Sequence, residues 1–341
     1  MGDFLKKIKI IISVALFITS VFCFTTTSFA AQVDGKYVTL GGETFGVKFY
    51  NDGVIIVQLE DFYDGEKYVC PAKSSGLAVN DIIKKANGDD IKSNEDLQKT
   101  AYECNGEPIS IEFERNGEIL ERKITPIHNT AGSYLLGAWV RDSCAGIGTI
   151  TYYDTDNNYF AALGHGICDN DTNALLPLGF GEVVHANISS VTKSIIGKAG
   201  SLNGYFTNDK IGNLTKNTDV GVFGTINSII NNKEKIEIAD FDEIKVGKAS
   251  IYTTINCDEI GCYDVEITKI CTSDSESNEN FVIKITSDKL LEECGGIVQG
   301  MSGSPIVQNG KLVGAVTHVF LNKTNEGYGV AIQNMVEHSV D

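Results

Sequence analysis

Proline, tryptophan and methionine are scarce in this sequence, and no internal repeat is visible. The 341 residues include five prolines, one tryptophan and three methionines. The lack of a heptad array, a solenoid period or a long low-complexity tract excludes coiled coils, repeat arrays and extended disordered tracts. Thirty-five glycines accompany plentiful isoleucine, valine, threonine and tyrosine, which is typical of β-strands joined by tight turns. The chain is long enough for two domains with an ample core.

Positively charged residues are also fewer than negatively charged ones. The sequence has 28 Lys and Arg against 45 Asp and Glu, a formal net charge of −17. A surface this acidic repels the phosphates of nucleic acids and anionic lipid headgroups. We therefore expect no nucleic acid as a partner, and membrane contact only through the N-terminal segment.

Long apolar runs are missing except at the N-terminus. Residues 10–24 form an apolar run, preceded by three lysines and followed by Ser28 and Ala30, small residues at the spacing of a signal-peptidase site. The run is shorter than the ~20 residues of a comfortable membrane span. The sequence predicts that residues 1–30 are a signal peptide, with an uncleaved membrane anchor as the alternative, and that the working part of the protein is exported.

Metal-binding motifs are absent as well. Nine cysteines, one of them in the N-terminal segment, permit disulfides in an exported protein, although a chain of this size does not need them. Neither a CxxC motif nor a nearby histidine pair completes a zinc site around Cys257 and Cys262. The segment starting at Asp154 opens like a calcium loop, but Tyr159 and His165 stand where glycine and glutamate are required. We expect no metal and no cofactor.

Residues 37–127 alternate short strands with one helical stretch. Alternating apolar residues predict strands in "FGVKFY", "GVIIVQLEDF" and "ISIEFERNGEILERKITPI", the last a hairpin that turns at Asn116 and Gly117. The stretch "SNEDLQKTAYEC" begins with a candidate N-cap, Ser93, and has apolar positions at helical spacing. A small α+β domain is predicted here.

Two stretches of this domain, "GLAVNDIIKKANGDDI" and "GEPISIEFERNGEILERKI", resemble a PDZ domain. That resemblance implies capture of an extended peptide, often its C-terminus, as an added strand beside a carboxylate-binding loop. The loop would be "GETFGVKF", in which Thr44, Phe45, Gly46 and Val47 offer backbone N–H groups. The alternative is a module that only packs against its neighbour.

Residues 128–341 read almost entirely as strands. One predicted hairpin, "IGTITYY" and "YFAALGH" around "DTDNN", ends by placing His165 between two glycines. Neighbours this small leave the imidazole poorly packed, so we expect it to face a cleft, where it could accept a proton near neutral pH. The alternative is a turn histidine with no role.

The stretch "GMSGSP" places Ser302 on a glycine-rich bend. Such a bend would aim the N–H groups of Gly300 and Ser302 into one oxyanion hole, as acyl transfer requires. The following "SPIVQNGKLVGAVTHV" predicts two strands joined at Asn309 and Gly310. This order resembles the chymotrypsin-like serine peptidases, marked by G-x-S-G-[GS]-P, with Ser302 as the nucleophile and Ser304 as the rival. The predicted fold class is mainly β: an N-terminal PDZ-like α+β domain followed by a chymotrypsin-like double β-barrel.

The third member of a triad is left open between two acids. Asp219, in "KNTDVGVFGTI", would keep the order His165, Asp219, Ser302 and could orient the imidazole. Asp288, shortly before the nucleophile bend, is the alternative acid. The triad is recognised by geometry and not by sequence position.

Three stretches, "ALGHGICD", "GGIVQGMSGSPIVQNGKLVGAVTHVF" and "GYGVAIQNM", resemble the stage IV sporulation protein B peptidases of endospore-forming bacteria. The resemblance implies a secreted serine endopeptidase between the two membranes around the forespore. It would cleave a membrane-associated regulator of an intramembrane protease and so activate a late sigma factor. The resemblance also implies self-cleavage near the N-terminus and control by the PDZ domain.

Other readings compete with a serine peptidase. One is a non-catalytic peptide-binding scaffold, and another is a cysteine peptidase using Cys168 or Cys294. Of the remaining histidines, His185 is expected to be exposed on a strand. His318 lies either beside the specificity pocket or packed against the barrel.

Overall fold

The computed structural model describes residues 37–227, 235–256 and 259–339. The predicted signal peptide therefore lies outside the described residues. Within them, no helix is both long and apolar enough to cross a membrane.

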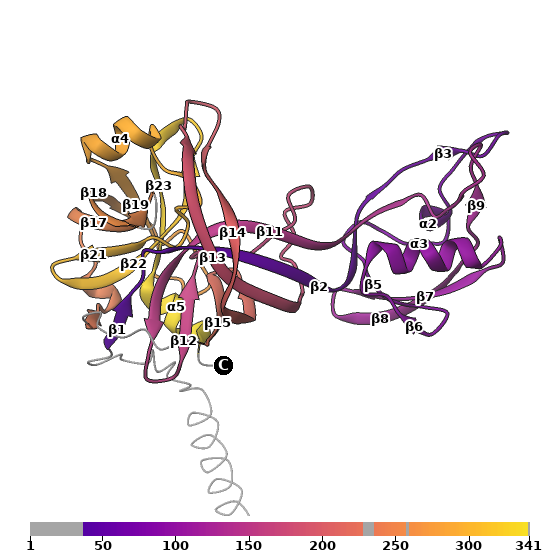
Figure 1. Cartoon of the computed structure of the whole chain (residues 1–341), viewed down its shortest axis with the longest axis horizontal. Helices are drawn as coiled ribbons and strands as arrows, with labels where there is room; N and C mark the ends of the chain where they lie inside the picture. The colour runs from indigo at the N-terminus through magenta and orange to yellow at the C-terminus, as the bar shows by residue number, and fades with distance from the viewer. Residues whose placement is uncertain (1–36, 228–234, 257–258, 340–341) are drawn as a thin grey trace, which may run out of the picture. The chain divides into compact units, whose positions relative to one another are not determined.

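Six antiparallel strands close into a first barrel (Figure 1). Around the ring, each strand pairs with the next and the last pairs with the first. The order is β2 (Thr44–Leu59), β11 (Ala138–Asp154), β12 (Tyr159–Ala162), β15 (Gly221–Ile226), β14 (Gly200–Thr218) and β13 (Leu178–Thr192). Its interior is one cluster of buried side chains, among them Phe45, Phe160 and Val222.

Six more antiparallel strands close into a second barrel. The order is β17 (Gly247–Thr254), β18 (Ile260–Ile270), β19 (Phe281–Ile285), β23 (Lys323–Ala331), β22 (Lys311–Phe320) and β21 (Pro305–Gln308). A separate core fills it, and two helices accompany it, α4 (Asp288–Cys294) and α5 (Ile332–Ser339). The hairpin at Asn309 and Gly310 is confirmed, with φ of 51° and 79°.

Short strands join the two barrels, and the sheet of 19 strands that results also includes four strands within residues 82–124 that belong to neither barrel. The connecting elements are β1 (Tyr37–Leu40), β16 (Lys235–Ile238), the 3₁₀ turn η1 (Phe241–Glu243) and β20 (Val298–Gln299). Strand β1 pairs with β11 and β16, β16 runs parallel to β22, and β20 runs parallel to β14. The predicted double β-barrel is thus present in the strand pairing itself.

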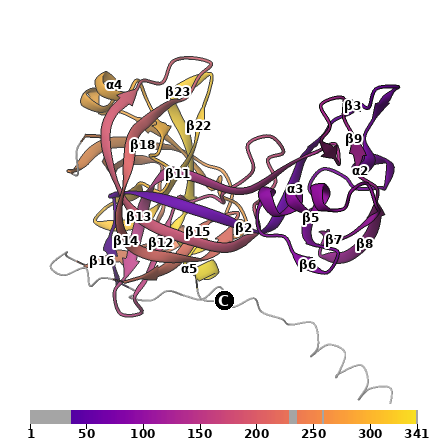
Figure 2. The same cartoon turned by 45° about the vertical axis from the view of Figure 1, so that its right-hand side comes forward.

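A third core belongs to an α+β module (Figure 2). Its elements are β3 (Phe62–Tyr63), β4 (Tyr68–Val69), α2 (Pro71–Ser74), β5 (Ile82–Ala86), β6 (Asp89–Asp90), α3 (Asn94–Glu103), β7 (Ile109–Arg115), β8 (Glu118–Ile124), β9 (Ile127–His128) and β10 (Tyr134–Leu135). The predicted N-cap is confirmed, because Ser93 forms a capping box with Asp96. The hairpin at Asn116 and Gly117 is also present. The order of elements is that of the predicted PDZ-like fold.

The boundary between the module and the barrels differs from the prediction of 37–127 and 128–341. Strand β1 and the first half of β2 pair with barrel strands. Near Gly53, with φ of +104°, the pairing of β2 with β11 shifts register, and β2 continues into the module to pair with β5. The module is therefore inserted between two strands of the first barrel. Sequence patterning missed this because β2 supplies buried residues to both cores.

Candidate active site

The nucleophile loop, residues 300–304, depends on two glycines. Gly300 and Gly303 have φ of +102° and +92°, a region that other residues rarely adopt. A Cβ at Gly303 would lie 2.0 Å from the carbonyl oxygen of Thr149 and 2.4 Å from the nitrogen of Leu163. The bend is therefore packed directly against the first barrel, beside the chain that leads to His165.

Two threonines of β11, which the sequence analysis missed, hold this loop. Thr149 Oγ1 donates to the Gly300 carbonyl at 2.7 Å, and Thr151 Oγ1 donates to the Gly303 carbonyl at 2.8 Å. The Thr149 N–H also donates to the Ser302 carbonyl at 3.0 Å. Both threonines are fully buried. The two threonines alternate within residues 144–153 of β11, a stretch that is otherwise apolar, aromatic or glycine.

The two serines of the loop have different surroundings. Ser304 is fully buried, and its Oγ donates to the Met301 carbonyl at 2.6 Å. Ser302 is only partly buried, and its Oγ donates to the Thr317 carbonyl at 2.9 Å. The N–H of Ser302 donates to no other described residue, which leaves it available for an oxyanion. The oxyanion role of Gly300 and Ser302 stays a prediction.

His165 lies on a strained loop after β12. The two residues before it, Leu163 and Gly164, have φ of +68° and +69°. His165 Nδ1 lies 2.7 Å from the Gly166 carbonyl. A carbonyl only accepts hydrogen bonds, so Nδ1 carries the proton in the neutral ring and Nε2 is left as the base. Burial, followed by the charge of His318, lowers the pKa of His165 to about 4, against a raising effect of the Gly166 carbonyl.

The loop that carries His165 packs between β22 and β14. A Cβ at Gly164 would lie 3.1 Å from the Thr317 side chain, and one at Gly166 would lie 2.7 Å from the Thr218 carbonyl. Asn217, a second residue missed in the sequence, clamps the same loop. Its Oδ1 accepts from the Ile167 N–H at 2.8 Å, and its Nδ2 donates to the Ile167 and Leu176 carbonyls, both at 2.9 Å.

Neither candidate acid is hydrogen-bonded to His165 among the described residues. Asp219 lies exposed in the turn between β14 and β15, next to Thr218, and its backbone carbonyl accepts from Asn278 Nδ2 at 2.8 Å. Asp288 is exposed in the first turn of α4, after the N-cap Ser287. The structure therefore brings the Asp219 turn to the base loop, and shows Asp288 in an ordinary helix-start position.

The peptide-binding loop predicted at Thr44–Val47 is wrong. These four residues lie in β2, where they pair with β11 on one side and with β13 on the other. All four are buried, and the Thr44 hydroxyl donates to the Ala186 carbonyl at 3.1 Å. An added strand needs a free edge, and here both edges are occupied.

The thiols do not form an alternative site. The seven described cysteines are free. Burial and then the charge of Asp219 raise the pKa of Cys168, and burial raises the pKa of Cys294 to about 12. A nucleophilic cysteine needs a lowered pKa, so both shifts oppose this chemistry. No group of three or more metal-binding side chains is present in the described ranges.

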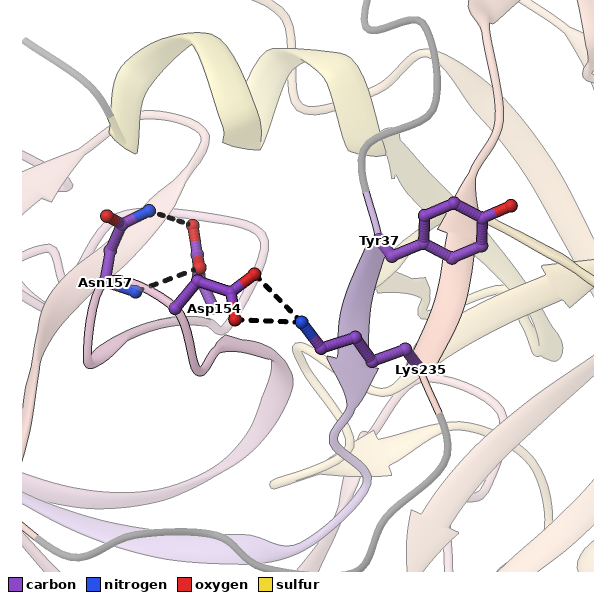
Figure 3. A pocket seen from close by; sticks show the side chains of 5 residues that line it. Tyr37, Asp154, Asn157 and Lys235 are labelled. Carbon is purple, nitrogen blue, oxygen red and sulfur yellow. Dashed lines mark hydrogen bonds and ion pairs between the residues drawn. The ribbon is translucent and has the colours of Figure 1, made fainter.

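A pocket at the edge of the first barrel contains neither His165 nor Ser302 in its lining. Figure 3 shows this cavity of about 550 Å³ with Tyr37, Asp154, Asn157 and Lys235. Lys235 Nζ contacts both carboxylate oxygens of Asp156, at 2.9 and 2.8 Å. Asn157 Nδ2 donates to Asp154 at 2.9 Å. These polar groups satisfy one another, so this pocket is not the reactive site.

Solved structures give distant similarities. The PDZ domain of the SdrC-like protein from Listeria monocytogenes is 19% identical with a TM-score of 0.22, covering 26% of this chain and 87% of that one. The active form of the Rv3671c protease from M. tuberculosis is 11% identical with a TM-score of 0.32, covering 57% and 72%. The HtrA-type protease AlgW with tripeptide is 13% identical with a TM-score of 0.35, covering 57% and 54%.

The sequence of the chain was also compared with curated proteins and with family models. No curated protein matches the chain, but the model of the family described as SpoIVB peptidase S55 matches residues 132–336. This range contains both His165 and Ser302. Because the match spans more than half of the chain, the protein belongs to the SpoIVB peptidase S55 family and is a serine endopeptidase.

Proposed function

We propose that this endopeptidase is exported and acts in sporulation signalling, where it cleaves a membrane-associated regulatory protein. The regulator would control an intramembrane protease, whose release activates a late sigma factor in the space between the forespore membranes. Family membership and the basic and apolar N-terminal residues support this proposal. Self-cleavage near the N-terminus would accompany it.

The observation that carries the chemistry is the contact between His165 Nδ1 and the Gly166 carbonyl at 2.7 Å. Because Nδ1 faces the Gly166 carbonyl, Nε2 can take the proton of Ser302 Oγ as the oxygen attacks the scissile carbonyl carbon. The negative charge on the carbonyl oxygen would meet the N–H groups of Gly300 and Ser302. The C–N bond then breaks, the amine leaves with the proton held on Nε2, and water hydrolyses the acyl-enzyme by the same route.

The structure represents a resting arrangement of these groups. Ser302 Oγ donates to the Thr317 carbonyl and not to His165, so the hydroxyl must rotate before it can be deprotonated. A substrate amide placed along β22 could take over the Thr317 carbonyl and release the hydroxyl. The third member would be Asp219, since its turn lies beside the base loop, with Asp288 as the alternative.

The test uses the full-length chain and its Ser302→Ala variant. We expect the wild type to cleave itself and an unfolded protein, and Ser302→Ala to lose at least ~10⁴-fold in rate at an unchanged Tm. His185→Ala, on an exposed position of β13, is the control. Equal cleavage by wild type and Ser302→Ala would contradict the assignment. Asp219→Asn should then cost more activity than Asp288→Asn.

Export is tested separately. Fusing alkaline phosphatase, which folds only outside the cytoplasm, after residue 36 should give an active enzyme. Deleting residues 10–24 from the fusion should abolish that activity. An active fusion without this segment would contradict an export signal.

We also propose that the α+β module binds an anionic peptide end in a different place from Thr44–Val47. A pocket of about 700 Å³ is lined by Lys67, Lys73 and Lys123 together with Asp61, Val69 and Ile127. All three lysines are exposed. Three lysines against one aspartate leave the lining with a net positive charge, which suits a C-terminal carboxylate.

Fluorescence anisotropy with labelled peptides tests this pocket. A peptide with a free C-terminal carboxylate should bind more tightly than the same peptide amidated. The double variant Lys73→Glu and Lys123→Glu should remove that difference, whereas Lys99→Glu, on α3, should not. Equal binding of the two peptides would contradict carboxylate capture.

A further inference from the structure

The strand β22 departs from regular pairing where it reaches the active site. From Val316 to Val319 it advances three residues while its partner β23 advances two. The extra residue forms a β-bulge at Thr317 and His318, and bulges often re-aim side chains beside active sites. A Cβ at Gly327 of β23 would lie 2.4 Å from the His318 carbonyl oxygen, so the bulge requires glycine opposite it.

The two residues of the bulge contact both reacting groups. The Thr317 carbonyl accepts the hydrogen bond of Ser302 Oγ at 2.9 Å. The ring of His318 lies against the ring of His165, with 4.8 Å between centroids and 31° between planes. One short segment of the second barrel therefore touches the nucleophile and the base.

The ring of His165 makes one hydrogen bond and one ring contact among the described residues. Its Nδ1 is bonded to the carbonyl of the next residue, Gly166, and no carboxylate of the described residues is bonded to it. In a Ser-His-Asp triad the carboxylate fixes the orientation of the imidazole. Here the ring contact with His318 comes from outside the base loop and can limit the rotation of the imidazole.

We propose that His318 is a positioning residue of this peptidase, which holds the imidazole of His165 in place by packing against its ring. His318 takes no proton from the substrate or from Ser302 in this role. The inference rests on Ser302 and His165 acting as nucleophile and base.

The charges around this pair are few and can be named. Burial lowers the pKa of His318, against a raising effect of Glu279 from the loop before β19. A protonated His318 in turn lowers the pKa of His165. Cys168 of the base loop contacts the Gly166 carbonyl, and burial and then the charge of Asp219 raise the pKa of Cys168. Since His165 must be neutral to act as a base, a positive His318 extends activity toward acidic pH.

Two substitutions of His318 in the full-length chain separate the effect of its ring from the effect of its charge. His318→Ala removes both, and we expect kcat to fall about tenfold to a hundredfold with KM changed less than about threefold. His318→Phe keeps a ring and removes the charge. It should recover most of kcat at pH 8, while the acidic limb of kcat/KM moves to higher pH. His185→Ala and His185→Phe are the matched controls and should change neither quantity.

A second readout does not depend on activity. In a Ser302→Ala background, the pKa of His165 followed by NMR should rise on His318→Phe. It keeps the inference testable even if His318→Ala does not fold or the chain cleaves nothing. A kcat of His318→Ala equal to that of the wild type would overturn the proposal, and an unchanged titration of His165 in His318→Phe would contradict the effect of the His318 charge. A loss in His318→Ala confined to KM would overturn it too, because His318 would then be a substrate contact.

Discussion

The nucleophile loop and the base loop reach the active site from different barrels and are held in different ways. The nucleophile loop belongs to the second barrel, but its carbonyls are fixed by hydroxyls of the first, Thr149 and Thr151. The base loop belongs to the first barrel and is fixed there by one amide side chain, Asn217.

This difference shows which contacts fix the conformation of each loop. Steric exclusion and buried hydrogen bonds leave the nucleophile loop one conformation. The base loop is held by three hydrogen bonds to Asn217 of its own barrel, and the ring contact with His318 comes from the opposite barrel. Each barrel thus contributes contacts to the loop that the other supplies. Catalysis therefore depends on the relative position of the two barrels.

The largest effect is expected where the two barrels touch. Gly303→Ala would place a Cβ 2.0 Å from the Thr149 carbonyl oxygen at a φ of +92°, so backbone must move. We expect a loss of more than about 4 kcal/mol in the free energy of unfolding and no activity, measured by chemical denaturation and peptide cleavage.

Its matched control is Gly310→Ala. Gly310 has a similar φ of +79° but nothing within 4 Å of an added Cβ. This change should cost only about 1 kcal/mol and leave kcat unaltered. If Gly303→Ala were as mild as Gly310→Ala, the contact between the barrels would not fix the nucleophile loop.

Removing the clamp on the base loop should have the next largest effect. Asn217→Ala leaves the Ile167 N–H and the Leu176 carbonyl without their partner, while the Ile167 carbonyl keeps the Leu176 N–H. The cost is roughly 1–3 kcal/mol for each group that water cannot reach. We expect kcat to fall and Tm to drop. Asn187→Ala is the control, since the Asn187 side chain makes one exposed contact of 3.4 Å. Equal effects of the two would show that Asn217 does not organise the loop.

A smaller and more selective effect is expected for Thr149→Val. Valine keeps the shape but removes the hydroxyl that donates to the Gly300 carbonyl, costing about 1–3 kcal/mol. Thr253→Val is the control, because the buried Thr253 hydroxyl has no hydrogen-bond partner in the described residues. That change should be neutral or stabilising. A neutral Thr149→Val, by denaturation and by kcat, would contradict the role of β11.

The nucleophile and its bend could be predicted from the sequence because their signals are local. Glycines around Ser302 and the Asn309–Gly310 turn specify backbone conformations within a few residues. Thr44–Val47 illustrates the opposite case. A glycine followed by an apolar run fits either a binding loop or a paired strand, and only the partners β11 and β13, some 100 and 140 residues away, decide between them.

The clamps and the inserted module were missed for the same reason. Thr149, Thr151 and Asn217 act through contacts with residues distant in sequence, and no spacing rule marks a threonine that will meet a carbonyl in another barrel. The insertion follows from β2 pairing with β11 across nearly 80 intervening residues, which periodicity within a window cannot detect.

The smallest effect is expected for Ser304→Ala, two residues after the nucleophile Ser302. Ser304→Ala removes a buried hydroxyl that donates to the Met301 carbonyl, but that carbonyl still accepts from the Ser304 N–H at 2.9 Å. The cost should be about 1 kcal/mol in unfolding free energy, with kcat within about twofold of the wild type. The same substitution at Ser302 leaves no nucleophile. If Ser304→Ala also abolished acylation by a fluorophosphonate probe while the protein stayed folded, Ser304 would be the reacting residue. The hydrogen bond from its hydroxyl to the Met301 carbonyl would then have to break in every turnover.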